Sequence, residues 1–456
     1  MLPLSPAYFA FAAVAITLYW LCYRWTAARL VILVAANFFF LARFAWFYPV
    51  LLLVAATIDY RIGIELQELP RRPDFTRRRR QFVTLSLLVN LGLLTATKLL
   101  PLGYDQLYHW VLPLSLSFYC FQSLTYTIDL YRGTKPGTRS YLEHLTAATL
   151  FSVIVAGPIN RVSDLIRQLR QPFALTSTEG GRAFLLIASG LMKKLLIADF
   201  LSENVVNRIF DTPTLYSGAE VLFGVYCYAL QIYFDFSGYT DIAMGVSQLL
   251  GLQVPDNFNR PYWSASIQEF WQRWHITFSH WLRDYVYFSL PSTRKRKWLN
   301  YVYPFIVMIL GGLWHGASWM FVLWGGLHGA YLVMEKVAQH FATPKPVFRI
   351  GKSCFIFLIV TLTWIPFRSS SPHQAFEIIR GLINVDELGQ VDLPKILAVL
   401  IMGLTVRWHI LMKGMRFDFV VQKNSATVAV VSGVLAMVSL FLFSSGNSNA
   451  FIYFQF

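Results

Sequence analysis

Long apolar runs recur along the whole chain, and they set the strongest limit on its fold. Only 14% of the 456 residues are charged and 56% are hydrophobic, whereas soluble domains usually carry about 25% charged residues. The chain therefore lacks the polar side chains to cover a water-facing surface of its size. This composition argues against a soluble enzyme, a disordered chain and a nucleic-acid-binding domain, and it predicts a polytopic membrane protein.

The same runs predict an all-α fold. A helix needs roughly 20 apolar residues to cross the hydrocarbon core, and within lipid only helices and closed barrels satisfy their own backbone groups. The runs are continuous and lack the period-two alternation of a barrel strand. We predict a single membrane domain over residues 1–456, with about ten to twelve membrane helices and further re-entrant or interfacial helices.

The positions of Lys and Arg predict a topology. No basic residue precedes the apolar stretch Tyr8–Tyr23, so we expect a retained span with its N-terminus outside, not a removable signal peptide. The short segment Leu145–Ile159 predicts a re-entrant or buried helix. Lys193 and Lys194 interrupt another predicted span and so indicate an aqueous recess. Besides 182–201, which contains Lys193 and Lys194, the other predicted spans are 30–41, 44–57, 82–100, 110–130, 354–366, 396–412 and 426–443, with further spans inside 216–252 and 301–337.

The chain has a formal net charge of +15, and two clusters of basic residues dominate this excess. They are Arg71, Arg72 and Arg77–Arg80, and Arg294, Lys295, Arg296 and Lys297. Such clusters are typical of cytoplasmic loops that contact anionic lipid head groups, and the alternative is attraction of an anionic cytosolic substrate. We expect no nucleic-acid partner, because no aromatic residues of a soluble single-strand groove accompany the charge.

The search for short motifs is mostly negative. The four cysteines are isolated and form no CxxC pair, so they predict core residues, or lipidation sites, and no disulfide framework or metal site. The chain has no glycine-rich nucleotide loop and no GxSxG elbow. The sequence therefore lacks the usual motifs of dinucleotide-dependent redox enzymes, ATP-driven transporters and serine hydrolases.

One polar and aromatic segment, Ser266–Leu290, lies among the apolar runs. We predict an aromatic helix suited to an interfacial position, with an i,i+4 ion pair between Glu269 and Arg273. His275 and His280 are five residues apart and so do not form the i,i+4 pair of a zinc site. His275 is either a hydrogen-bonded structural residue or one that orients a substrate, and we expect His280 to be structural.

His315 lies within an apolar run, flanked by Gly311, Gly312 and Gly316. Glycines at these positions allow close approach of another backbone or a break in the helix. A lone buried histidine is usually a structural core residue. Alternatively, a neutral imidazole in a water-poor passage accepts the proton of an alcohol that attacks a thioester. His328 is a weaker candidate for the same role.

Seven segments carry a resemblance to a known family. They are SFYCFQSLTYTIDLYRG (117–133), AGPINR (156–161), QIYFDFSGYTDIAMG (231–245), NFNRPY (257–262), EFWQRWHITFSHWLRDYVY (269–287), GGLWHGASWMFVLWGGLHG (311–329) and FIYFQF (451–456). In order and spacing they resemble the membrane-bound O-acyltransferase family, in its bacterial alginate O-acetyltransferase-like branch. One departure is Phe288–Thr293, where the family usually has a basic, glycine-containing loop.

The resemblance implies a helical fold around a tunnel with a cytosolic mouth. His315 matches the buried histidine of the Trp-His-Gly motif, and His275 matches the second family position. We expect His315 to act as general base and His275 to orient donor or acceptor. Residues expected to line the tunnel are Trp314, Trp319, Trp274, Arg273 and Asp284, and Arg294 to Lys297 are expected to steer the donor.

The resemblance also implies a function. We expect a multi-pass enzyme of the bacterial inner membrane, surrounded by lipid, that takes acetyl from cytosolic acetyl-CoA without a metal. The acceptor is expected to be an extracytoplasmic polysaccharide, reached directly or through a periplasmic SGNH-type partner. The alternatives are D-alanyl transfer to teichoic acid from a carrier-protein thioester, and glycan or lipid export without chemistry. The identity of the glycan and the oligomeric state do not follow from the sequence.

Overall fold

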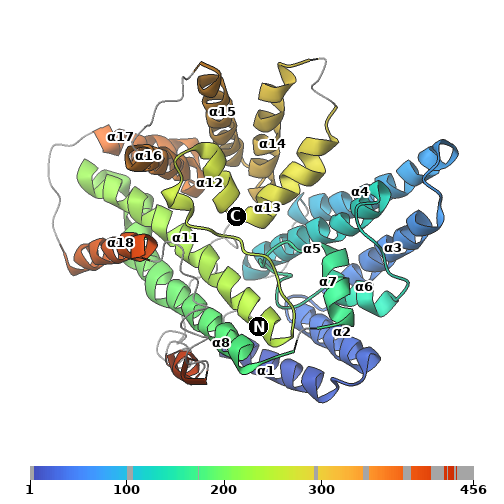
Figure 1. The fold of residues 1–456 in the computed structure, drawn as a ribbon. Helices are drawn as coiled ribbons and strands as arrows, with labels where there is room; N and C mark the ends of the chain where they lie inside the picture. Colours follow the sequence, from blue (N-terminus) through green and yellow to red (C-terminus); the bar gives the residue numbers. More distant parts are fainter. Residues whose placement is uncertain are drawn as a thin grey trace. The chain divides into compact units, whose positions relative to one another are not determined.

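The computed structural model describes residues 5–99, 106–172, 174–291, 296–341, 349–383 and 392–411, with 426–428, 430–435 and 438. Over these residues the chain is built from helices and contains no strand, which confirms the predicted all-α fold for this part (Figure 1). Residue contacts divide the chain into two compact units. The first comprises Met1–Leu191, Tyr239–Pro255 and Phe417–Gln455, and the second comprises Met192–Gly238 and Asp256–Arg416. The prediction of one membrane domain over 1–456 stays a prediction.

The first unit contains eight α-helices that the described residues define before α11. They are α1 (Pro6–Leu21), α2 (Thr26–Ala42), α3 (Tyr48–Glu68), α4 (Thr76–Leu99), α5 (Gln106–Arg132), α6 (Tyr141–Ala148), α7 (Val162–Arg170) and α8 (Ser177–Leu191). The expected re-entrant segment 145–159 is buried throughout, but its helix ends at Ala148 and turns follow. α11 (Gly218–Leu249) contributes residues to both units.

A buried carboxylate joins α3, α4 and α5. Asp59 on α3 accepts hydrogen bonds from Ser86 (2.6 Å) and Asn90 (2.8 Å) on α4 and from Ser123 (2.6 Å) on α5. All four side chains are buried. Because a buried charge is tolerated only when it is hydrogen-bonded, these contacts fix the three helices against one another.

Arg79, within the first basic cluster, is buried and does not face lipid or solvent. Its guanidinium donates to the carbonyl oxygens of Leu66 (2.7 Å) and Leu69 (2.8 Å) at the end of α3, and of Leu130 (3.1 Å) and Tyr131 (3.0 Å) at the end of α5. The last carbonyls of a helix have no partner within it. One side chain therefore caps two helices.

The second unit begins with irregular helix and ends with longer helices. Its elements are α9 (Asp199–Leu201), α10 (Asn207–Asp211), the start of α11, α12 (Ile267–Arg273), α13 (Ile276–Trp281), α14 (Leu299–His315), α15 (Trp319–Phe341), α16 (Arg349–Arg368), α17 (Pro372–Ile383) and α18 (Leu393–Leu411). π-helical segments lie at Met192–Ala198, Ser202–Val206 and Leu282–Val286, and 3₁₀ turns at Pro213–Leu215, Pro261–Trp263 and Tyr287–Ser289.

The lysine pair that interrupts a predicted span lies in the first π-helical segment. Lys194 is 2% exposed, and its Nζ lies 2.7 Å from Asp199 Oδ1 and 2.6 Å from Asp235 Oδ1. π-bulges inside α-helices occur frequently at functional sites. A buried ion-paired triad occupies this place, where an aqueous recess was predicted.

The apolar run 301–337 forms a helical hairpin. α14 ends at His315 where Gly316 turns extended, and α15 begins at Trp319. A Cβ on Gly312 would collide with the carbonyl oxygen of Phe321, and one on Gly325 with that of Met308. The two helices can lie side by side, as Figure 1 shows, because these positions lack side chains.

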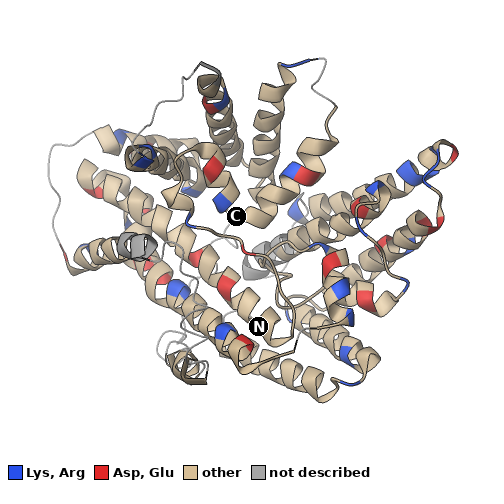
Figure 2. Ribbon diagram, in the orientation of Figure 1, with Lys and Arg blue, Asp and Glu red and all other residues tan. Residues whose placement is uncertain are grey.

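Charged residues are sparse along α14 and α15 and gather toward the helix ends (Figure 2). Among the described helices, α16 alone is long and apolar enough to cross a membrane by length and composition. The apolar helices α1, α2 and α14, with Leu393–Leu404 of α18, are shorter. The predicted number of passes stays a prediction, and part of the predicted span 426–443 lies outside the described residues.

Candidate active site

His275 lies at a sharp break between α12 and α13. Its backbone is left-handed, with φ of 42°, a conformation uncommon for residues other than glycine. The preceding segment holds this break: Asn259 N–H donates to Arg273 O (2.9 Å) and Ile276 N–H to Asn257 O (3.0 Å). The predicted single helix over Ser266–Leu290 is therefore wrong, because tertiary hydrogen bonds divide it at His275.

The Asn257 side chain completes this support. Its Oδ1 accepts from the hydroxyl (2.6 Å) and the backbone N–H (3.3 Å) of Thr277, in the first turn of α13. Asn257 itself is fully buried. The side chain thus stabilises the start of α13 and, with it, the position of His275; sequence reasoning gave Asn257 no role.

Aromatic rings enclose the His275 imidazole, which is 1% exposed. Phe236 on α11 meets it edge-on, with ring centroids 4.7 Å apart and planes at 86°. Phe278 lies 5.0 Å and Trp314 6.1 Å from it by centroids. The ring therefore occupies a largely apolar interior position.

His315, at the end of α14, lies in the same cluster and is 7% exposed. Its ring contacts Trp324 at 5.2 Å, Phe367 at 5.0 Å and Phe278 at 6.2 Å between centroids. Phe278 and Trp314 touch both histidines. The structure thus brings the two predicted site histidines together around a shared pair of aromatic rings.

Of the other predicted site residues, Trp274 belongs to the ring cluster, and Arg273 and Asp284 form ion pairs with neighbouring residues. Trp274 is buried and stacks on Phe270 (5.6 Å, 18°) in the same ring cluster. Arg273 forms the predicted ion pair with Glu269, at 2.7 Å. Asp284 is half-buried and accepts a hydrogen bond from Arg283 Nε at 2.8 Å.

Trp319 does not lie beside Trp314, although both were expected to line the same tunnel. Trp314 is buried beside His315, but Trp319 is 80% exposed, because it begins a new helix after the break at Gly316 and no longer shares a helical face with Trp314. Of the second basic cluster, Arg296 and Lys297 are exposed. Arg294 and Lys295 lie outside the described residues.

A cavity of about 450 Å³ lies at the opposite end of the α14–α15 hairpin from His315. Pro304 and Met308 of α14 and Lys336 of α15 belong to its walls, with Trp271 of α12 and Arg283. Met308 is seven residues before His315, about 10 Å along the helix. The cavity lies at the hairpin end where the second basic cluster precedes α14.

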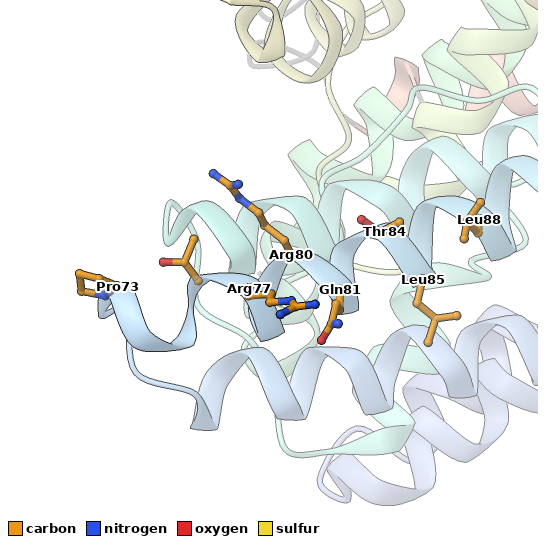
Figure 3. A pocket seen from close by; sticks show the side chains of 8 residues that line it. Pro73, Arg77, Arg80, Gln81, Thr84, Leu85 and Leu88 are labelled. Carbon is orange, nitrogen blue, oxygen red and sulfur yellow. The ribbon is translucent and has the colours of Figure 1, made fainter.

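A second hollow, of about 590 Å³, lies on the first unit along α4. Figure 3 shows Arg77 and Arg80 toward one end and Leu85 and Leu88 toward the other. All its lining residues belong to α4 or to the 3₁₀ turn before it. Arginine heads above a leucine face are typical of a helix surface at the boundary between head groups and acyl chains.

Comparison with known proteins identifies the family to which the sequence is similar. Residues 135–365 match the model of the membrane-bound O-acyltransferase family. The chain is 34% identical over 383 residues to the probable alginate O-acetylase AlgI of Azotobacter vinelandii, covering 80% of this chain and 75% of that relative. It is 29% identical over 402 residues to the peptidoglycan O-acetyltransferase of Helicobacter pylori, covering 80% and 75%. With the teichoic acid D-alanyltransferase of Bacillus subtilis it shares 29% identity over 197 residues, 40% and 48% of the two chains.

Proposed function

This chain belongs to the membrane-bound O-acyltransferase family, and on that premise we propose that it takes acetyl from cytosolic acetyl-CoA and delivers it to hydroxyl groups of an extracytoplasmic polysaccharide. It is a membrane O-acyltransferase. The acetyl assignment is supported by the relatives named as O-acetylases and O-acetyltransferases, which align over 80% of the chain. A multi-pass position in the bacterial inner membrane belongs to the same proposal.

The enclosure of His315 beside His275 is the observation that carries this function. In the proposed step, the His315 imidazole accepts the proton of the acceptor hydroxyl while the oxygen attacks the thioester carbonyl carbon. The carbon–sulfur bond breaks, and the imidazolium returns the proton to the departing thiolate. The step consumes one thioester and one alcohol and yields one ester and one thiol, so it needs no metal or oxidant. His275 orients donor or acceptor.

The aromatic rings around His315 are proposed to protect the thioester from water during transfer. Trp314, Trp324 and Phe367 pack against the His315 ring and exclude water, which would otherwise hydrolyse the thioester. The cavity is lined by two basic side chains, Arg283 and Lys336, and by the carboxylate of Glu335. Its excess of positive charge is proposed to attract an anionic donor, and Arg296 and Lys297 are proposed to steer that donor. Arg294 and Lys295, of the same cluster, extend that steering charge.

Donor choice separates the proposed function from its main alternative. In inverted membrane vesicles containing the full chain, the cytosolic face is outside and the acceptor is enclosed in the lumen. We expect acetyl label from acetyl-CoA to appear on enclosed alginate or peptidoglycan oligosaccharides, with release of free thiol. An SGNH-type acetyltransferase enclosed with the acceptor tests whether the acetyl passes through such a partner.

The alternative is D-alanyl transfer, which the match to the teichoic acid D-alanyltransferase favours. A D-alanyl carrier-protein thioester is therefore supplied in a parallel reaction with teichoic acid as acceptor. Transfer of D-alanine with no transfer of acetyl would overturn the acetyl assignment. If glycan crosses the membrane and neither thioester is consumed, both acyl-transfer assignments are overturned and glycan export remains as the function.

A further inference from the structure

Three aromatic side chains between the cavity and His315 touch one another. Trp271 of α12 lies 5.0 Å from His328 and 5.8 Å from Trp324 by ring centroids, and Trp324 lies 5.0 Å from His328. Trp271 also lines the cavity, and Trp324 contacts His315 at 5.2 Å. We refer to Trp271, Trp324 and His328 as the indole–imidazole triad. It connects the cavity to the candidate base through direct ring contacts.

Each member of the triad carries a polar atom that lacks a hydrogen-bond partner among the described residues. These atoms are the indole Nε1 of Trp271, the indole Nε1 of Trp324 and the Nδ1 of His328, and all three are buried. Buried polar groups are nearly always hydrogen-bonded, and each one left unsatisfied destabilises the fold. Three such atoms on mutually touching rings indicate a ligand or ordered water.

The hydrogen bonds of Thr363 fix the chemical character of His328. The Thr363 hydroxyl donates to Val360 O at 2.6 Å and lies 3.0 Å from His328 Nε2. A hydroxyl has only one proton to donate, so Thr363 accepts from the N–H at Nε2. A neutral imidazole protonated at Nε2 leaves Nδ1 as a bare acceptor. The triad therefore offers two donors and one acceptor.

We propose that the indole–imidazole triad binds an amide group of the acyl donor's thioester arm. An amide carbonyl accepts the indole N–H groups of Trp271 and Trp324, and an amide N–H donates to Nδ1 of His328. This inference rests on the proposed function, because the pantetheine arm that carries an acetyl thioester in acetyl-CoA contains amides. Between the cavity and His315, the triad sets the depth to which the arm enters and thus the place of the carbonyl carbon.

The test compares donors with and without amides. Full-length enzyme in lipid nanodiscs receives S-acetyl-pantetheine or an acetyl thioester of equal length whose amides are replaced by methylene groups. The variants Trp271→Phe and Trp324→Phe keep an aromatic ring and remove the indole N–H. His328→Phe keeps an aromatic ring and removes the Nδ1 acceptor, together with the Nε2–H donor toward Thr363. The matched control is Trp281→Phe, at a buried tryptophan of α13 outside the triad.

We expect the wild type to prefer the amide donor in kcat/KM. Each triad variant should lower the ratio of kcat/KM for the amide donor to kcat/KM for the methylene donor about tenfold, as expected for a lost buried hydrogen bond. Trp281→Phe should leave the ratio between the donors at its wild-type value. Equal losses with both donors, or no loss with either, would overturn the proposal and leave packing or ordered water as the role of the triad.

Failure of the proposed function gives a different result. If the wild type transfers D-alanine and not acetyl, the acetyl assignment fails, but the comparison of amide and methylene donors can be run unchanged with D-alanyl thioesters. If the enzyme transfers acetyl and the triad variants leave the ratio of kcat/KM between the two donors unchanged, only the proposed amide site is overturned.

Discussion

The imidazole of His315 stands edge-on to the indole of Trp324, with ring centroids 5.2 Å apart and planes at 90°. The two rings come from the two arms of the α14–α15 hairpin. Gly312 and Gly325 permit that hairpin to close, because a side chain at either position would meet backbone of the other helix. The position of the candidate base is thus a consequence of helix packing.

The first prediction concerns that base. His315→Ala should lower turnover of the acetyl thioester by about 10²- to 10⁴-fold, the usual contribution of a general base, while thermal unfolding in detergent stays close to that of the wild type. The matched control is His373→Ala on α17, whose side chain is exposed. A His315→Ala enzyme that releases thiol as fast as the wild type would show that this ring is not the base.

The second prediction separates the His275 ring from its backbone. Asparagine tolerates the left-handed region better than most residues, so His275→Asn should preserve the α12–α13 break and lower turnover through loss of the ring alone. His275→Ala should also reduce the free energy of unfolding, by about 1 kcal/mol. Thermal unfolding and initial rates measured on both variants distinguish these effects. Wild-type turnover in His275→Asn would assign the histidine a purely structural role.

Hydrophobic patterning predicted most of the helices because an apolar run of sufficient length has few alternatives in a membrane protein. α2, α4, α5, α11 and α16 each overlap a run identified in the sequence. The glycines around His315 also indicated a close approach, and Gly312 provides it. These features depend on the residues within one short segment, so they can be predicted from the sequence of that segment.

The features that sequence reasoning missed depend on contacts between distant segments. The break at His275 is held by hydrogen bonds that the backbone of Asn257 accepts and the backbone of Asn259 donates, and no periodicity within 266–290 encodes them. Trp319 lies outside the ring cluster because α14 ends at His315. Adjacency of Trp271 to His328 arises only when α12 packs on α15.

The third prediction tests the hairpin contact with two neighbouring glycines. Gly325→Ala should destabilise the fold by about 1–3 kcal/mol, as overpacking usually does, because its Cβ would collide with the carbonyl oxygen of Met308. Gly326 has no described atom within 4 Å of an added Cβ, so Gly326→Ala should be neutral or slightly stabilising through helix propensity. Thermal unfolding of both variants checks this. Equal effects of the two substitutions on the unfolding temperature would mean that Gly325 does not make the tight contact between the helices.

The fourth prediction concerns the arginine that caps α3 and α5. Arg79→Met should lower the free energy of unfolding by more than about 2 kcal/mol, because four carbonyl oxygens lose a charged donor. The control is Arg78→Met, whose exposed side chain lies 3.6 Å from Glu65 and should contribute less than about 1 kcal/mol. Similar unfolding temperatures for the two variants would mean that Arg79 acts, like its neighbours, through charge alone.

The fifth prediction concerns the buried triad of Lys194, Asp199 and Asp235. Lys194→Met leaves two buried carboxylates without their cation and should destabilise the protein by about 3–5 kcal/mol. Lys193→Met, at the half-buried neighbour, serves as the control.

Adding Asp235→Asn to Lys194→Met should recover part of the loss, because one of the two uncompensated charges is removed. Strictly additive effects in this double-mutant cycle would mean that the two side chains do not interact. Since Phe236, next to Asp235, contacts the His275 ring at 4.7 Å, Lys194→Met should also lower turnover, and the double variant should recover activity together with stability.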